Sequence, residues 1–211
     1  MRLVYIPTLE HNSFEQHYAS ECRQGSQKML RENYKTLISK LVEDDAFRGW
    51  VISSPLAKDN EFSRYDLTPE EAEMAEQIAW IRGYHLFDNV SADEWLYLLS
   101  GTILQKFKSG SAITRQGEQG ENLYLILSGE VAILMRDSKN NWRHIATQGR
   151  GTIIGELAVL YEISRSATVI AHTEVWTLSM DKQTYMDLSR HVPSFAHNVK
   201  QIATARLSSM I

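Results

Sequence analysis

The sequence predicts an α+β fold in which an antiparallel β-roll of jelly-roll type is flanked by N-terminal and C-terminal helices. Residues 13–44 are polar and place apolar residues at the three-and-four spacing of one helix face. From about Ile103 to residue 180, short β-favouring runs alternate with Gly, Ser and Asn, which is typical of antiparallel strands joined by turns. Helix signals return after residue 180, so the predicted order is helices, roll, helices.

The front of the chain is predicted to contain a long helix and a linker. Ser13 is a suitable cap for the helix, although Gly25 weakens its middle by about 1 kcal/mol relative to Ala. The apolar positions that share one helix face are Leu30, Tyr34, Leu37, Ile38 and Leu41. Residues 52–67 are rich in turn-forming residues and are interpreted as a linker. We therefore assign residues 1–67 to a helical extension and linker, and residues 68–211 to a domain.

Two more helix starts are predicted before the roll. The stretch Thr68-Pro69-Glu70-Glu71 supplies an N-cap, a Pro at the first helical position and a capping-box Glu, and it opens a helix to about Gly83. Ser91 and Glu94 repeat the capping-box pattern for a short helix that ends near Gly101.

The roll is predicted over about 103–180, with helices over 181–211. Its β-favouring runs lie at 103–107, 111–116, 123–128, 130–137, 143–147, 166–172 and 174–179. Asp181 is a suitable N-cap for a helix from Lys182 to about Arg190. Pro193 interrupts that helix, and a second helix is predicted from there to the C-terminus.

Composition narrows the class of protein. The 211 residues include 43% apolar residues and carry a net charge of −4, so a packed core is expected and no overall charge favours nucleic acid or membrane. Residues 1–80 hold 9 Lys and Arg against 14 Asp and Glu, and residues 81–211 hold 13 against 12. The single Cys22 cannot form an internal disulfide and fits a reducing compartment. No apolar run reaches the roughly 18 residues of a membrane span, and no signal peptide is recognisable, so a cytoplasmic protein is expected.

The segment from Gly155 to Val169 has the chemistry of an anion site. Gly155 leads into a short helix-compatible stretch, where backbone N–H groups can approach an anion closely. Arg165, at the entrance of a predicted strand, offers a forked and permanently charged donor that suits a phosphate. Glu156 is an acceptor that suits a sugar hydroxyl. On these residues alone, an Arg165–Glu156 salt bridge across a turn is an equal alternative.

Two motifs resemble those of cyclic-nucleotide-binding domains, as in protein kinase A regulatory subunits, catabolite-activator-type regulators and cyclic-nucleotide-gated channels. Ile154-Gly155-Glu156-Leu157-Ala158 and Arg165-Ser166-Ala167 match that family's phosphate-binding cassette in sequence and spacing. Upstream, the glycine-punctuated stretch from Gly117 through Gly120 to Val131 resembles the family's β-roll hairpin. The resemblance covers roughly residues 80–211.

The resemblance implies roles for individual residues. Glu156 would accept a hydrogen bond from the ribose 2′-hydroxyl, and Arg165 would neutralise the cyclic phosphate. Gly155 would permit the close turn. Backbone N–H groups of Leu157, Ala158 and Ser166 would complete the phosphate cradle, and Ala167 completes the motif. The Pro that often precedes the Arg in kinase regulatory subunits is Ser164 here, which puts the stiffness of the loop in doubt.

The resemblance indicates fewer specific residues for the base of the ligand than for its phosphate. The Ser166 hydroxyl suits either purine, with cyclic AMP favoured over cyclic GMP. Candidate base contacts are polar residues of the last helix: Gln201, Thr204 and Arg206. A solvated helix face explains these three residues equally well.

The resulting hypothesis is a cyclic-mononucleotide sensor in signal transduction, whose C-terminal helices close over the ligand and which has no catalytic activity. No cofactor is expected beyond the ligand itself. The alternative is a protein-interaction module whose pocket binds no nucleotide. The acidic N-terminal helix could engage a partner, form a homodimer or fold against the roll; we favour the last two.

Other kinds of site are not supported by the sequence. The seven histidines are scattered without metal-ligand spacing, so no metal site is expected. No nucleophile–base pair is legible, and neither phosphate-loop nor dinucleotide fingerprints occur.

Overall fold

A computed structural model describes residues 83–208 and, nearer the N-terminus, residues 34, 36–41, 43–47, 49, 67–68, 71, 74–75 and 77–78. The helical elements are η2 (His85–Phe87), α5 (Ala92–Gly101), α6 (Glu156–Tyr161), α7 (Lys182–His191) and α8 (Pro193–Ser208). The strands are β1 (Ile103–Phe107), β2 (Ala112–Thr114), β3 (Asn122–Ser128), β4 (Val131–Arg136), β5 (Trp142–Gln148), β6 (Ile153–Ile154), β7 (Thr168–Ala171) and β8 (Val175–Asp181). The predicted α+β class and the order of helices, roll and helices are confirmed.

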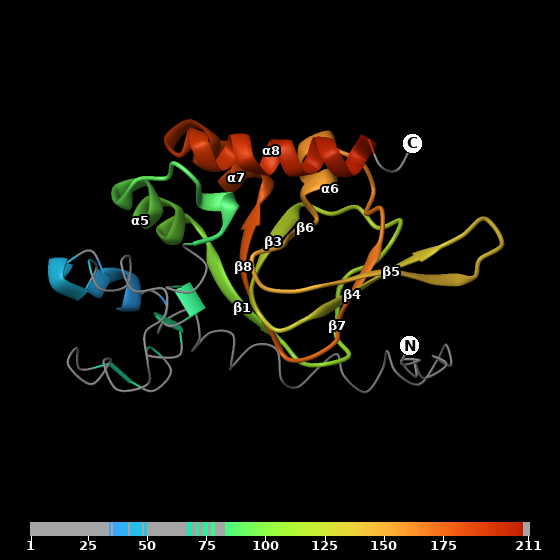
Figure 1. Cartoon of the computed structure of the whole chain (residues 1–211), viewed down its shortest axis with the longest axis horizontal. Coiled ribbons are helices and arrows are strands. Elements are labelled where there is room, and N and C mark those ends of the chain that lie inside the picture. Colours follow the sequence, from blue (N-terminus) through green and yellow to red (C-terminus); the bar gives the residue numbers. More distant parts are fainter. Residues whose placement is uncertain are drawn as a thin grey trace.

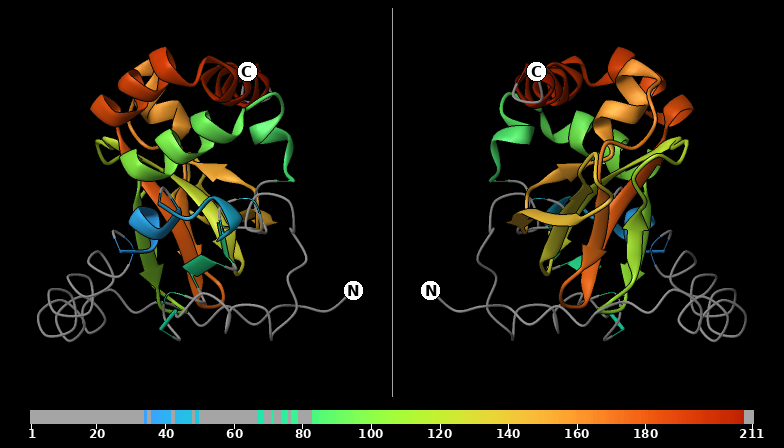
Figure 2. Two further views of the ribbon diagram at one scale, coloured as in Figure 1. Left: turned by 90° about the vertical axis from the view of Figure 1, so that its left-hand side faces the viewer. Right: turned by 90° about the vertical axis from the view of Figure 1, so that its right-hand side faces the viewer.

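The strands form two antiparallel four-stranded sheets with the orders β1-β8-β3-β6 and β2-β7-β4-β5. Most neighbouring strands are distant in sequence, as expected for a roll rather than a series of hairpins. Figure 1 shows the two sheets facing each other, with α6 and α8 along one end of the roll and the β4–β5 hairpin projecting from its side. The two views in Figure 2 agree that α6, α7 and α8 gather at that end.

The sequence-predicted helix starts are formed by the expected side chains. Ser91 accepts from the Glu94 backbone N–H, and the Glu94 carboxylate accepts from the Ser91 backbone N–H, which completes the capping box of α5. Asp181 accepts from the Thr184 backbone N–H at the start of α7. Thr68 and Glu71 make the same reciprocal pair in the part of the front region that the structure describes.

The structure differs from the prediction at several element boundaries. The run 166–172 forms a strand only over Thr168–Ala171, and just before it Arg165 forms backbone hydrogen bonds with Gly117 and Glu118 in the loop before β3. The pair Ile153–Ile154 forms the short strand β6, and the 3-10 turn η2 was not predicted. The predicted front helix is described only from Tyr34 onward, where residues 36–41 are helical, and of the predicted linker only Leu67 is described.

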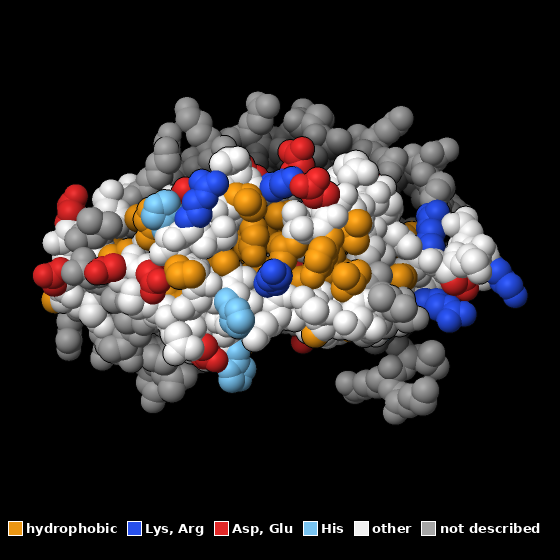
Figure 3. Space-filling model, turned by 90° about the horizontal axis from the view of Figure 1, so that it is seen from above, with side chains coloured by type: hydrophobic (Ala, Val, Ile, Leu, Met, Phe, Trp, Pro, Cys, Tyr) orange, Lys and Arg blue, Asp and Glu red, His pale blue; other side chains and the backbone are white. Residues whose placement is uncertain are grey.

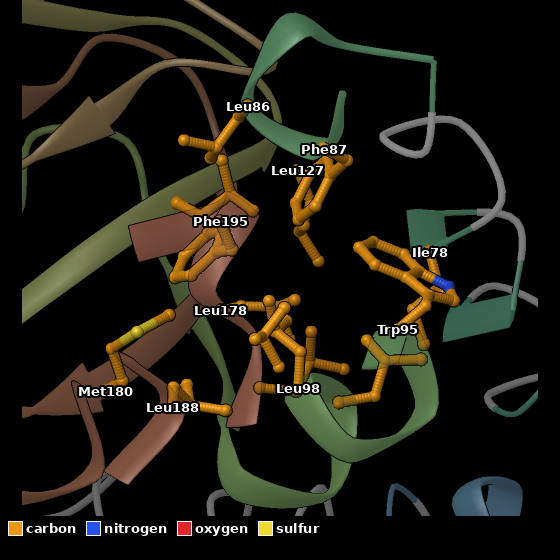
Figure 4. Packing of buried hydrophobic residues seen from close by; sticks show 14 of the residues in the cluster. Ile78, Leu86, Phe87, Trp95, Leu98, Leu127, Leu178, Met180, Leu188 and Phe195 are labelled. Carbon is orange, nitrogen blue, oxygen red and sulfur yellow. The ribbon is translucent and has the colours of Figure 1, made fainter. Parts of the chain in front are cut away.

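The main core lies between the roll and the helices. Figure 4 shows Phe87, Trp95 and Phe195 from η2, α5 and α8 meeting above Leu178 of β8. The Phe87 ring packs edge-on against Trp95 at 4.4 Å and stacks on Phe195 at 5.9 Å between ring centroids. Aromatic contacts therefore join η2 to α5 and to α8, and all three pack in one cluster with Leu178 of β8.

The described part of the front helix belongs to this core. The apolar positions predicted to share one face, Tyr34, Leu37 and Leu41 among them, are buried in the same cluster. The Tyr34 hydroxyl donates to the Leu99 carbonyl oxygen at 2.8 Å, at the end of α5. Of the roles expected for this helix, packing against the rest of the chain is the one that the described residues show.

Candidate phosphate-binding cassette

Backbone hydrogen bonds join the loop before β3 to the segment before β7. The Gly117 N–H donates to the Arg165 carbonyl oxygen at 2.9 Å, and the Arg165 N–H donates to the Glu118 carbonyl oxygen at 2.8 Å. The Gln116 N–H donates to the Thr168 hydroxyl at 3.0 Å. The two motifs singled out in the sequence are therefore parts of one site, held in fixed register.

Arg165 is the most unusual side chain at this site, because it is charged and only 8% exposed. Its guanidinium donates from Nη1 to the Gly155 carbonyl oxygen at 2.9 Å and from Nη2 to the Asn122 carbonyl oxygen at 2.6 Å. Burial lowers the pKa of Arg165, and this effect is only partly offset by Tyr124, Glu156 and Glu118 nearby. A buried cation held by neutral carbonyls is suited to receiving an anion.

Gly155 forms the turn between β6 and α6. Its φ of 79° lies in the left-handed region, which favours glycine, and it occupies the N-cap position of α6. A Cβ atom on Gly155 would lie 2.3 Å from Arg165 Nη1 and 2.9 Å from the Asn122 carbonyl oxygen. The first N–H groups of a helix have no partner inside it, so those of Leu157 and Ala158 are suitably placed donors for an anion.

Glu156 is 2% exposed and does not pair with Arg165. Its Oε1 atom accepts from Arg206 Nη1 at 2.7 Å, and the same nitrogen donates to the Ile153 carbonyl oxygen at 2.6 Å. The Arg165–Glu156 salt bridge, the equal alternative on sequence grounds, is therefore not formed. Arg206, expected as a candidate base contact, lies against the carboxylate expected at the ribose.

The other two candidate base contacts lie differently. Thr204 forms a hydrogen bond at 3.2 Å with the Tyr161 hydroxyl, at the end of α6. Gln201 is within 2.9 Å of His197 on the exposed side of α8, and among the described residues it contacts no part of the cassette. A hollow of about 500 Å³ adjoins this side of α8, lined by His197, Lys200, Gln201, Thr204 and Ala205. Since no cassette residue lines it, we do not assign the ligand to it.

Among the remaining cassette residues, Ser166 has a hydroxyl that is available to bind a ligand. Ser166 is half-buried, and its side chain makes no hydrogen bond to the described residues. The Ala167 carbonyl oxygen accepts from the Thr114 hydroxyl at 3.2 Å, which ties the cassette to β2. Asn122 and Gly120 were not singled out individually as site residues; their signal was the upstream glycine-punctuated motif.

No three His, Cys, Asp or Glu residues within the described ranges are grouped so as to hold a metal ion. None of the described helices is long and apolar enough to cross a membrane. Figure 3 shows apolar side chains along the middle of the face over α6, α7 and α8, with Lys and Arg side chains separated from one another on it and others grouped at the end where the β4–β5 hairpin projects. This face lacks the continuous basic stripe that typifies nucleic-acid binders.

Comparison with known proteins gives consistent matches. Residues 104–191 match the model of the cyclic nucleotide-binding domain family. The chain is 31% identical over 127 residues to the cyclic AMP receptor protein of Thermus thermophilus, covering 60% of this chain and 59% of that protein. It is also 31% identical over 132 residues to the cAMP-dependent protein kinase type II regulatory subunit of Drosophila melanogaster, covering 62% and 34%. The chain thus spans less than two thirds of either relative.

Solved structures show the same likeness. The catabolite activator protein of Thermus thermophilus has a TM-score of 0.56 at 30% identity, over 59% of each chain. The regulatory subunit of a cAMP-independent protein kinase A from Trypanosoma brucei has a TM-score of 0.55 at 27% identity, over 64% of this chain and 50% of that one.

Proposed function

We propose that residues 104–191, which match the model of the cyclic nucleotide-binding domain family, bind a cyclic mononucleotide and act as a regulatory sensor without catalytic activity. Cyclic AMP is favoured over cyclic GMP. The observation that supports this most is Arg165: a buried guanidinium, fixed by two backbone carbonyls and left without a carboxylate partner among the described residues. A cyclic phosphate supplies the missing charge.

In the proposed complex each cassette group has one role. Arg165 and the N–H groups of Leu157, Ala158 and Ser166 hold the phosphate, and Gly155 keeps the turn close to it. Glu156 accepts from the ribose 2′-hydroxyl, because a carboxylate has two oxygens and only Oε1 is bonded to Arg206. The Ser166 hydroxyl and residues of α8 face the base.

The ligand is also proposed to act on α8. Glu156 in the first turn of α6 binds Arg206 in the last turn of α8, and Tyr161 at the other end of α6 binds Thr204. A ribose hydroxyl that donates to Glu156 would therefore bind the same carboxylate that holds the end of α8. We propose that closure of α7 and α8 over the ligand is the regulatory output, and that its extent depends on the difference in ligand affinity between two states.

A cytoplasmic location is also proposed. The single Cys22, which cannot form an internal disulfide, fits a reducing compartment. A homodimer or a protein partner that engages the N-terminal region stays a prediction.

Calorimetry with cyclic AMP and cyclic GMP tests the proposal. Wild-type protein should bind, and Arg165→Ala should weaken binding about 100-fold, since charge-assisted contacts to phosphate each contribute about 1.5–3 kcal/mol. The control is Arg190→Ala, which removes an exposed Arg of α7 and should leave affinity unchanged. Tight binding that survives Arg165→Ala would refute the role of Arg165.

The ribose assignment has its own test. 2′-Deoxy cyclic AMP should bind wild-type protein about 10-fold more weakly than cyclic AMP, because it lacks the hydrogen-bond donor for Glu156. Equal affinities would refute that role.

The alternative is an interaction module that keeps the fold and binds no nucleotide. This alternative has a precedent in the fold, because a similar solved structure is the regulatory subunit of a protein kinase A described as cAMP-independent. Absence of any thermal shift with saturating cyclic AMP, cyclic GMP and cyclic CMP would favour it.

A further inference from the structure

Gly120 lies in the loop between β2 and β3, directly against Arg165. A Cβ atom on Gly120 would lie 1.9 Å from Arg165 Nε, 2.1 Å from Cζ and 2.5 Å from Nη2. These distances are far below van der Waals contact, so only glycine leaves room for the guanidinium where it stands.

A glycine is needed at position 120 because of the space available to a side chain and not because of the backbone conformation. Four described glycines have less than 3 Å between a would-be Cβ and the nearest atom: Gly120, Gly129, Gly151 and Gly155. The last three have φ near +80°, where any side chain is strained, whereas Gly120 is not among the residues with positive φ. The φ of Gly120 therefore does not exclude an alanine, and the three atoms nearest to its added Cβ all belong to the Arg165 side chain.

The loop cannot easily move away to make room. Gly117 and Glu118, just before Gly120, form backbone hydrogen bonds with Arg165 itself. Asn122, just after it, starts β3 and accepts from Arg165 Nη2. Since the loop is tied to Arg165 on both sides, the group that can give way is the long, flexible arginine side chain.

We infer that Gly120 is a positioning residue for the phosphate site: it reserves the space in which the Arg165 guanidinium stands ready for the ligand. This inference rests on the proposed role of Arg165 in binding phosphate. Any larger residue at position 120 displaces the guanidinium from the carbonyl oxygens of Gly155 and Asn122. The upstream glycine motif thereby has a specific function in the cassette, although the two are distant in sequence.

The substitution Gly120→Ala tests the inference against a matched control. Gly83→Ala makes the same chemical change where φ is not positive and no atom lies within 4 Å of the added Cβ. Gly120→Ala should weaken cyclic AMP binding about 10- to 100-fold, and Gly83→Ala should leave it unchanged. Wild-type affinity in Gly120→Ala would overturn the inference.

A double-variant cycle with Arg165→Ala identifies the cause. If Gly120 acts through Arg165, then Gly120→Ala causes no further loss of affinity once Arg165 is Ala. If Gly120→Ala alone lowers the melting temperature, the double variant should regain that of Arg165→Ala, because the clash is gone. Equal losses of affinity in both backgrounds, or a melting temperature that the double variant does not recover, would overturn the inference.

A readout independent of ligand separates this inference from the proposed function. With ¹⁵N-labelled arginine, the Nε–H signal that disappears in Arg165→Ala belongs to Arg165. That signal should shift in Gly120→Ala and stay in place in Gly83→Ala; an unchanged signal refutes the positioning role. If wild-type protein binds no cyclic nucleotide while the Arg165 signal shifts as expected, the proposed function fails and the positioning role of Gly120 stands.

Discussion

The main core between the roll and the helices, called the helical core below, and the phosphate-binding cassette are both buried. The helical core buries mostly apolar side chains, whereas the cassette buries charged ones. In the helical core, Trp95, Leu98 and Phe195 are at most 1% exposed, and its polar Tyr34 is satisfied by the Leu99 carbonyl oxygen. In the cassette, Glu156 and Arg165 are buried charges that do not pair with each other. Apolar burial stabilises the fold, whereas buried charge opposes it unless it is compensated. The first region therefore stabilises the fold, and the second carries buried charges that fit the ligand-binding role proposed for it.

The largest expected effect is on the helical core. Trp95→Ala should lower the free energy of unfolding by about 3–5 kcal/mol, because it removes a fully buried ring that contacts Phe87. Nucleotide affinity of the folded fraction should not change. Trp142→Ala, at an exposed site of β5, is the control and should lose at most about 1 kcal/mol. Urea denaturation measures both, and comparable losses in the two variants would contradict the division between the regions.

The next effect concerns compensation within the cassette. Arg206→Ala should cost about 2 kcal/mol of unfolding free energy, because it leaves the Glu156 carboxylate buried without its cation. This figure is below that of a fully buried pair because the Arg206 side chain is 35% exposed. Adding Glu156→Gln should recover part of the loss. If Arg206→Ala is as stable as wild type, the pair does not hold α8 to the cassette.

A smaller effect tests the polar group of the helical core. Tyr34→Phe should cost about 1 kcal/mol, since it removes the hydrogen bond to the Leu99 carbonyl oxygen and leaves the ring in place. Burial raises the pKa of Tyr34 well above its usual range. The folded state therefore keeps this proton when the unfolded state loses it, and stability should fall as pH rises above about 10. That fall should be weaker in Tyr34→Phe, and identical pH profiles would argue against a buried hydroxyl.

The smallest expected effect concerns the N-cap residue Asp181, where β8 passes into α7. Asp181→Ala should cost about 0.5–1 kcal/mol through loss of the N-cap, whereas Asp181→Asn should be nearly neutral at pH 7. Hydrogen bonds with Thr184 lower the pKa of Asp181. This contribution is therefore complete above the unfolded pKa of about 4 and is lost as pH falls through the folded pKa. Thermal unfolding of Asp181→Asn should lack that acid-dependent part; an unchanged acid dependence would exclude Asp181 as its source.

Much of the fold was predictable because its signals are local. The capping pairs Ser91–Glu94 and Thr68–Glu71 and the cap at Asp181 each involve residues within one helical turn, so sequence spacing determines them. Strand positions followed from alternation between apolar runs and turn residues. Ends of strands were less accurate, as at residues 166–167, because pairing with strands distant in sequence decides where a strand begins: β7 pairs with β4 and β2 only from Thr168 onward.

The candidate site was predictable to a similar degree. Gly155, Glu156 and Arg165 lie within one short segment, so their types and spacing are sufficient to indicate an anion site. The partners of the charged groups were not predictable in this way. Arg206 reaches Glu156 from 50 residues away, and the place of Arg165 depends on Asn122 and Gly120.

By itself, then, the sequence determined the class of fold and the helix starts, and it indicated the candidate site residues, because periodicity and side-chain type act over a few neighbouring residues. Only the tertiary structure decided which groups contact each buried charge. Arg165 takes neutral carbonyls and Glu156 takes Arg206 because the roll and α8 bring these groups together across long stretches of chain. Burial then excludes the water that would otherwise satisfy each charge separately, so the partner that packing supplies determines what the site can bind.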